Sequence, residues 1–147
     1  MSFRVEVVIP GEPIGQGRPR FARRGTFVTA YDPPKSRDWK SGARACMMAA
    51  LPEPARLPFP AGKALTVTVH AVFSRPAGSY SKRTPKGREV KITRPDTENV
   101  VKAVLDAGTG TLWHDDSQVW RLTAWKEIGA QDEAPFVRLT VSDEVAA

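Results

Sequence analysis

The stretch that decides the fold is Arg94–Val119, which reads RPDTENVVKAVLDAGTGTLWHDDSQV. At about 100° per residue, its apolar side chains share one helical face, which is formed by Val100, Val101, Val104 and Leu105. Gly108 and Gly110 interrupt this pattern, so we expect a helix from Thr97 to Ala107. One face of that helix is apolar and must be buried against another element, which indicates a helix packed on a sheet.

Strand patterns lie on both sides of this segment. The strongest is Lys63–Phe73, where every second residue is apolar. Weaker strand patterns cover Phe3–Ile9, Thr26–Thr29, Trp120–Ile128 and Phe136–Ser142, and a second helical pattern covers Lys35–Leu51. This order predicts an α+β fold, a single small domain over residues 1–147, with a mixed β-sheet of about four to five strands and two main helices packed on it.

Length and composition exclude several classes of protein. A chain of 147 residues suits one domain, and its single cysteine can form neither an intramolecular disulfide nor a cysteine-rich zinc site. The short apolar start ends at Pro10 and Gly11, which does not fit a secretory signal peptide. No stretch approaches the roughly 18 apolar residues of a membrane span. We therefore expect a cytoplasmic protein with no membrane partner.

The positive charge is concentrated in two segments. The chain holds 22 Lys and Arg against 16 Asp and Glu, a net charge of +6, and residues 1–45 and 74–94 carry sixteen of those 22 basic residues. Such segments suit a polyanionic partner, although they are also compatible with solvated loops. Our candidates for phosphate contacts are Arg18, Arg20, Arg23, Arg24, Lys82, Arg83, Lys86 and Arg88.

Acidic residues dominate the segment that follows the second basic one. Asp96 and Glu98 lie two residues apart at the start of the expected helix, and Asp115 and Asp116 follow the glycine-rich turn. If the chain folds back, these carboxylates meet around a hard cation such as Mg²⁺. Lys102, one turn beyond Glu98, would then stabilise charge on a phosphate.

Each acidic residue also has a purely structural explanation. Asp96 suits the N-cap of the helix, and Glu98 with Lys102 forms an i,i+4 pair of the stabilising orientation. The Asp115–Asp116 pair suits a plain turn. The structural explanations account less well for the joint occurrence of an acidic cluster, Lys102 and a basic segment.

The same stretch resembles the RusA family of Holliday-junction resolvases. The family pattern is Asp-x-Asp-Asn near a helix start, a Lys three residues later, and an aromatic-rich turn ending in Asp-Asp-x-Gln-Val or -Ile. Here it reads Asp96-Thr97-Glu98-Asn99, Lys102, and Trp113-His114-Asp115-Asp116-Ser117-Gln118-Val119, with Glu98 in place of the usual Asp. An early strand ending in proline and the Gly-Arg-Pro-Arg-Phe loop extend the resemblance over most of the chain.

The resemblance carries specific implications for the site and for the assembly. It implies a RusA-like fold, a homodimer and the cleavage of two strands of a four-way DNA junction with Mg²⁺, with Mn²⁺ as an alternative cation. It implies catalytic roles for Asp96, Glu98, Asp116 and Lys102, metal ligation by Asp96, Glu98, Asp115 and Asp116, and a DNA contact by Asn99.

The leading hypothesis is therefore a Mg²⁺-dependent, structure-selective endodeoxyribonuclease that resolves four-way junctions by paired nicks in recombination and repair. Glu98 in place of Asp keeps open a second hypothesis, a junction-binding protein with weak or no cleavage. A third hypothesis is a metal-dependent phosphohydrolase acting on a small substrate, for which the surplus of loop arginines and lysines has no obvious use.

Overall fold

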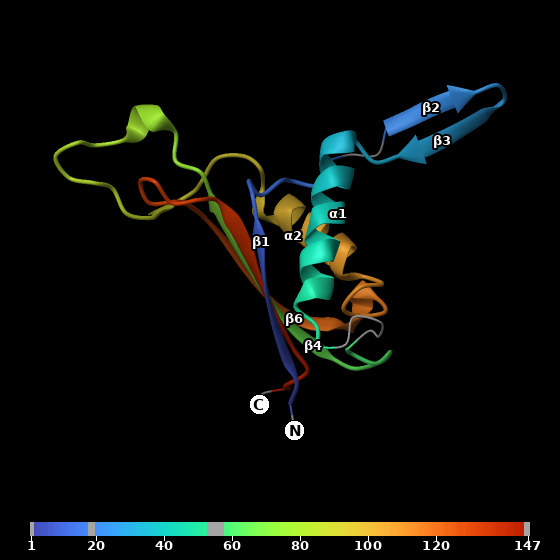
Figure 1. The fold of residues 1–147 in the computed structure, drawn as a ribbon. Coiled ribbons are helices and arrows are strands. Elements are labelled where there is room, and N and C mark those ends of the chain that lie inside the picture. The colour runs from blue at the N-terminus through green and yellow to red at the C-terminus, as the bar shows by residue number, and fades with distance from the viewer. Residues whose placement is uncertain (1, 18–19, 53–57, 146–147) are drawn as a thin grey trace.

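The computed structural model describes residues 2–17, 20–52 and 58–145, and its centre is a five-stranded mixed sheet (Figure 1). The strand order is β1-β7-β4-β6-β5. Only the β4–β6 pair among these neighbours is parallel. The strands are β1 (Arg4–Pro10), β4 (Leu65–Phe73), β5 (Glu89–Val90), β6 (Val119–Ile128) and β7 (Phe136–Ser142).

Helices α1 (Pro34–Ala49) and α2 (Thr97–Gly108) lie on the same side of this sheet (Figure 1). Val100, Val101 and Val104 of α2 are buried, as the valine pattern predicts. Every second residue of β4, from Leu65 to Phe73, is also buried beneath the helices. The predicted α+β fold with two main helices on a mixed sheet is therefore confirmed, and its core lies between the helices and the sheet.

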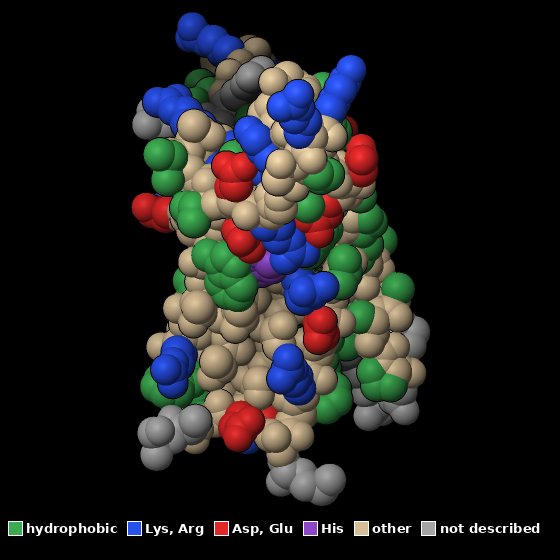
Figure 2. Space-filling model, turned by 90° about the vertical axis from the view of Figure 1, so that its left-hand side faces the viewer, with side chains coloured by type: hydrophobic (Ala, Val, Ile, Leu, Met, Phe, Trp, Pro, Cys, Tyr) green, Lys and Arg blue, Asp and Glu red, His purple; other side chains and the backbone are tan. Residues whose placement is uncertain are grey.

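The opposite face of the sheet carries no helix in the described part of the chain. It displays Thr66 and Thr68 of β4 and Arg121 and Thr123 of β6, which also line a shallow hollow. Figure 2 shows a view toward this side of the molecule, where Lys and Arg side chains are interspersed with Asp and Glu side chains. This face is mostly polar, as expected for a sheet face in contact with water, but Val8 and Trp125 are also exposed on it.

A separate two-stranded sheet projects from the N-terminal end of α1, away from the main sheet (Figure 1). It is a hairpin of β2 (Arg20–Arg24) and β3 (Phe27–Tyr31), and its turn contains Gly25 with φ +61°. The sequence predicts a strand close to β3 but none at β2. The reason is that the β2 sequence, RFARR, has no alternation of apolar and polar residues. This strand exists only through its pairing with β3.

Two short 3-10 helices complete the structure, η1 (Ala77–Ser79) and η2 (Asp116–Gln118). None of the described helices has the length and apolar character that crossing a membrane requires.

Candidate functional site

Asp96 occupies the N-cap position of α2. Its backbone carbonyl accepts hydrogen bonds from the N–H groups of Asn99 at 3.0 Å and Val100 at 3.1 Å, which begin the helix. Its side chain makes no capping hydrogen bond and is exposed. The Asp96 carboxylate is therefore available to a ligand rather than used to cap the helix.

Lys126 fixes the backbone that leads into Asp96. From β6, its ammonium group donates hydrogen bonds to the carbonyl oxygens of Thr93 and Pro95, each at 2.6 Å. Hydrogen bonds from a charged donor are stronger than neutral ones, so the turn before the helix is held firmly to the sheet. Lys91 lies nearby, and its pKa is lowered by burial and by the charge of Lys126.

A shallow hollow surrounds Asp96 and is lined by Gly15, Gln16, Arg94, Pro95, Asp96 and Asn99. The N-terminal loop approaches α2 closely here, because a Cβ atom on Gly15 would lie only 2.8 Å from the Cβ of Pro95. The Gln16 N–H donates to the Asn99 carbonyl at 2.9 Å. Within the described part of the chain, the buried Oε1 atom of Gln16 has no hydrogen-bond partner. Gln16, whose side-chain oxygen is unsatisfied, thus lines the same hollow as Asp96, a predicted metal ligand.

Glu98 and Lys102 form the i,i+4 ion pair that their spacing predicts. Lys102 Nζ lies 3.5 Å from Glu98 Oε1, and both side chains are more than half exposed. Such a pair stabilises a helix by only a few tenths of a kcal/mol, so it does not prevent either group from turning to a ligand.

Asp116 lies at the other end of α2. Its Oδ1 atom accepts hydrogen bonds from the Trp113 indole N–H at 3.0 Å and from the Thr109 hydroxyl. Trp113 is completely buried and packs directly against Gly108, where a Cβ atom would come within 2.2 Å of the ring. The position of the Asp116 carboxylate is therefore set by the packing at the C-terminal end of the helix.

Asp115 has a structural role that the sequence left open. It is the N-cap of η2, and its side chain accepts a hydrogen bond from the Ser117 N–H at 2.8 Å, which lowers the pKa of the Asp115 carboxyl. Gln118 completes this capping box through the N–H groups of His114 and Asp115. The Gln118 amide also donates to two backbone carbonyls of residues 60–63. Gln118 thus ties the acidic turn to a distant connector, a role that sequence patterns do not reveal.

The structure does not bring the four predicted metal ligands together, which corrects the expected cage within one protomer. Asp96 and Glu98 lie at the start of α2, whereas Asp116 contacts Thr109 beyond its end. A helix of 12 residues is about 18 Å long at 1.5 Å per residue. Across the described residues, no three or more Asp, Glu, His or Cys side chains lie close enough to hold a metal ion. The turn after Gly108 folds back only onto the C-terminal end of α2 and does not reach Asp96 at the N-terminal end.

Comparison with known proteins identifies the family. A family model described as endodeoxyribonuclease RusA matches residues 10–141, which is most of the chain. The chain belongs to the RusA endodeoxyribonuclease family. It is also 30% identical over 118 residues to a Bacillus subtilis (strain 168) protein described as uncharacterized protein YqaN, covering 78% of this chain and 81% of that protein.

The predicted DNA-contacting residues of this RusA family member differ in whether their side chains are free in solvent or already paired with an acidic residue. Arg18 and the side chain of Arg20 lie outside the described part of the structure. Arg23 and Arg24 are exposed on the hairpin, and Lys82, Arg83 and Lys86 are exposed on the basic loop, residues 74–94. These five side chains are oriented as phosphate-binding groups require, toward solvent.

Arg88 differs from the other predicted DNA contacts because it already has an anionic partner. Its guanidinium donates to both carboxylate oxygens of Glu133, with the shortest contact at 2.7 Å. This hydrogen bonding lowers the pKa of Glu133 to about 2 and raises that of Arg88. A guanidinium bound in this bidentate way is less available to a phosphate than its neighbours are.

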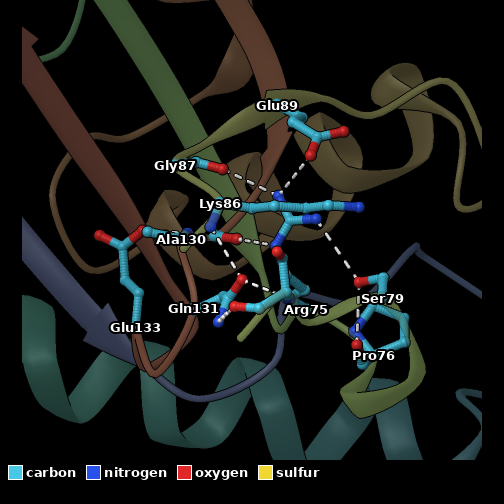
Figure 3. Close-up of polar contacts among 11 residues, drawn as sticks. Arg75, Pro76, Ser79, Lys86, Gly87, Glu89, Ala130, Gln131 and Glu133 are labelled. Carbon is cyan, nitrogen blue, oxygen red and sulfur yellow. Dashed lines mark hydrogen bonds and ion pairs between the residues drawn. The ribbon is translucent and has the colours of Figure 1, made fainter. Parts of the chain in front are cut away.

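The basic loop is held in place by polar contacts at its base (Figure 3). Buried Arg75 donates to the carbonyls of Gly129 at 3.0 Å and Gly87 at 2.8 Å, and pairs with Glu89 at 3.0 Å. The Gln131 side-chain oxygen accepts from two further N–H groups of the loop, each at 2.8 Å. Arg75 therefore contributes to the positive charge counted in the sequence but serves to shape the loop, which presents the exposed lysines and arginines.

Proposed function

We propose that this chain is a Mg²⁺-dependent, structure-selective endodeoxyribonuclease that nicks four-way DNA junctions. The observation that carries the proposal is the exposed Asp96 carboxylate at the start of α2, reached by two basic segments in a member of the RusA family. One basic segment leads directly into Asp96 through Arg94, and the other is joined to the same hollow through Gln16.

The donor atoms at both ends of α2 fit Mg²⁺. This ion prefers oxygen ligands and is commonly held by one or two carboxylates together with water and substrate phosphates. The first end of α2 offers the carboxylates of Asp96 and Glu98 and the unsatisfied Gln16 oxygen, and the second end offers Asp116 with Asp115 beside it. When bound, such an ion polarises the scissile phosphate and lowers the pKa of the attacking water, and Mn²⁺ would serve in the same way.

The remaining groups of the chain have roles that follow from their charge. Lys102 is exposed on the helix that carries Asp96, where its ammonium group can stabilise negative charge on the phosphate. The exposed arginines and lysines of the hairpin and basic loop neutralise backbone phosphates and release counterions. Asn99, at the edge of the hollow, contacts the DNA near the scissile bond. Selectivity then comes from the shape of the junction rather than from base sequence.

A homodimer suits this substrate, because a junction presents two equivalent strands and a two-fold dimer presents one site to each. Since a single protomer holds its acidic pairs at opposite ends of α2, a second copy is a natural source of the missing carboxylates. Mixing Asp96→Asn protein with Asp116→Asn protein tests this arrangement. If each site takes carboxylates from both protomers, the mixed dimers contain one intact site and regain nicking. If each site lies within one protomer, the mixed dimers stay inactive.

The proposed function is tested by incubating the protein with a synthetic four-way junction and with a linear duplex, each with and without Mg²⁺. We expect paired nicks in the junction only, and only with the metal. Tight junction binding without nicking in Mg²⁺ or Mn²⁺ would support the junction-binding alternative. Hydrolysis of a small phosphodiester with no preference for DNA would support a phosphohydrolase.

A further inference from the structure

We infer that the β2–β3 hairpin is a wedge that inserts Phe27 into the base stack at the branch point of the junction; this inference rests on the proposed function. The hairpin exposes large apolar side chains on both of its faces. Phe27 is 75% exposed, Phe21 70% and Val28 64%. Apolar side chains left this accessible on a projecting element indicate a surface that is covered by a partner.

The hairpin is an arm rather than part of the core. Its two strands pack on each other, and among the described elements no other strand or helix packs extensively against them. A two-stranded hairpin is marginally stable alone in water, so an arm of this kind gains stability from whatever it binds. Each strand has five residues, which gives the arm a reach of about 17 Å at 3.3 Å per residue. That reach exceeds the depth of a DNA groove, about 8 Å.

The base of the arm is fixed to the protein body on both sides. Before β2, the Gly17 N–H donates to the buried Ser36 hydroxyl at 3.1 Å. After β3, Asp32 forms an ion pair with Lys40, which is 4% exposed and lies 3.6 Å from Asp106 of α2. The base of the arm is therefore linked through Lys40 of α1 to Asp106 of α2, the helix that carries Asp96.

The chemistry of the tip selects nucleic acid over a second copy of the chain. Residues 20–31 contain three arginines and no acidic residue. Across the ladder, Arg24 pairs with Phe27 on one face and Arg23 pairs with Val28 on the other, so each face presents an apolar group beside a cation. Proteins that kink DNA insert apolar side chains between base steps while cations bind the flanking phosphates. Unstacking a base step costs free energy, and the contacts that the bent DNA then makes with the protein offset this cost.

The test uses a junction with a fluorescent base analogue, 2-aminopurine, at the branch point. Wild-type protein should raise its fluorescence, because unstacking relieves quenching. Phe27→Ala should abolish the rise and slow junction nicking by about 10-fold, whereas binding changes by less than about threefold, because the contact energy of the inserted ring is offset by the cost of unstacking the bases. Phe27→Leu, which keeps an apolar side chain, should give an intermediate result. Met48→Ala is the control, since it removes an exposed apolar side chain of α1, outside the arm, and it should behave as wild type.

Several results would overturn the wedge. These are an unchanged fluorescence rise in Phe27→Ala, an equal loss of the rise in the Met48→Ala control, or a change from dimer to monomer by light scattering in Phe27→Ala, which would assign the tip to self-association. If wild-type protein nicks the junction while Phe27→Ala does so equally well, only the wedge fails. If wild-type protein neither binds nor nicks the junction selectively, the proposed function fails with it.

Discussion

Gly108→Ala should destabilise the protein, although alanine is the better helix former. Gly108 is the last residue of α2, and a Cβ atom there would lie 2.2, 2.5 and 2.8 Å from three carbon atoms of the Trp113 ring. Carbon atoms in contact are normally about 3.5–4.0 Å apart, so the overlap exceeds 1 Å. The indole cannot move aside easily, because it is completely buried and its N–H is bonded to Thr109 and Asp116.

The magnitude follows from two opposing contributions. Overpacking a well-packed core costs about 1–3 kcal/mol, and an overlap this large places the cost in the upper part of that range. Replacing Gly by Ala within a helix recovers at most about 1 kcal/mol, and less in the last turn. We therefore expect Gly108→Ala to lower the free energy of unfolding by about 1–2 kcal/mol. Nicking should fall as well, because the same ring holds Asp116.

Gly42→Ala provides the matched control. Gly42 lies within α1, and no atom lies within 4 Å of the position that its Cβ would occupy. The same substitution there should raise the free energy of unfolding by about 0.5–1 kcal/mol. Urea unfolding at 25 °C, with m-values compared to confirm an unchanged transition, measures both variants. A Gly108→Ala protein as stable as wild type, or stabilised like Gly42→Ala, would refute the proposed packing of Trp113 on α2.

Three further predictions concern polar groups. Thr109→Val keeps the shape of the side chain but removes a hydrogen bond to Asp116, so stability should fall by about 1 kcal/mol and nicking more strongly, as measured by urea unfolding and single-turnover cleavage. The pKa of Glu133 is depressed to about 2, so the contribution of its pair with Arg88 is present above about pH 4.5 and is lost as the pH falls toward 2. Between about pH 4.5 and 2, the free energy of unfolding should therefore fall by about 1 kcal/mol less in Glu133→Gln than in wild type, after allowance for solvent screening. The same dependence on pH in both proteins would exclude the pair. Arg83→Ala should reduce the slope of log binding constant against log salt by about 0.9, whereas Arg88→Ala should leave it nearly unchanged.

The sequence predicts the elements that pack against the core. Phe136–Ser142 is a strand over the predicted residues, and α2 extends only one residue beyond its predicted end. Both have apolar side chains at the period of their own secondary structure, because one face of each is buried. By contrast, β2 and the two-residue β5 escape prediction, since neither buries an apolar face and both exist through pairing with a neighbour.

The site was predictable only in its residue types. The sequence placed Asp96 at the start of α2, and it left open whether the chain folds back far enough for Asp116 to reach it. That outcome depends on the turn at Gly108–Trp113, where local hydrogen bonds keep Asp116 at the near end of the helix. The contacts of Gln16 and Lys126 with the start of α2 join residues far apart in the chain, which no local pattern encodes.

The most direct test of the account is single-turnover nicking of a four-way junction in Mg²⁺ by Asp116→Asn, with junction binding measured in parallel. Asp132→Asn is the control, because Asp132 lies in a turn outside the acidic site with φ +65°, a conformation that asparagine tolerates. We predict that Asp116→Asn loses nicking by about 100-fold or more while binding is retained, and that Asp132→Asn behaves as wild type. Nicking by Asp116→Asn at the wild-type rate would contradict the assignment of this carboxylate to the metal-dependent site.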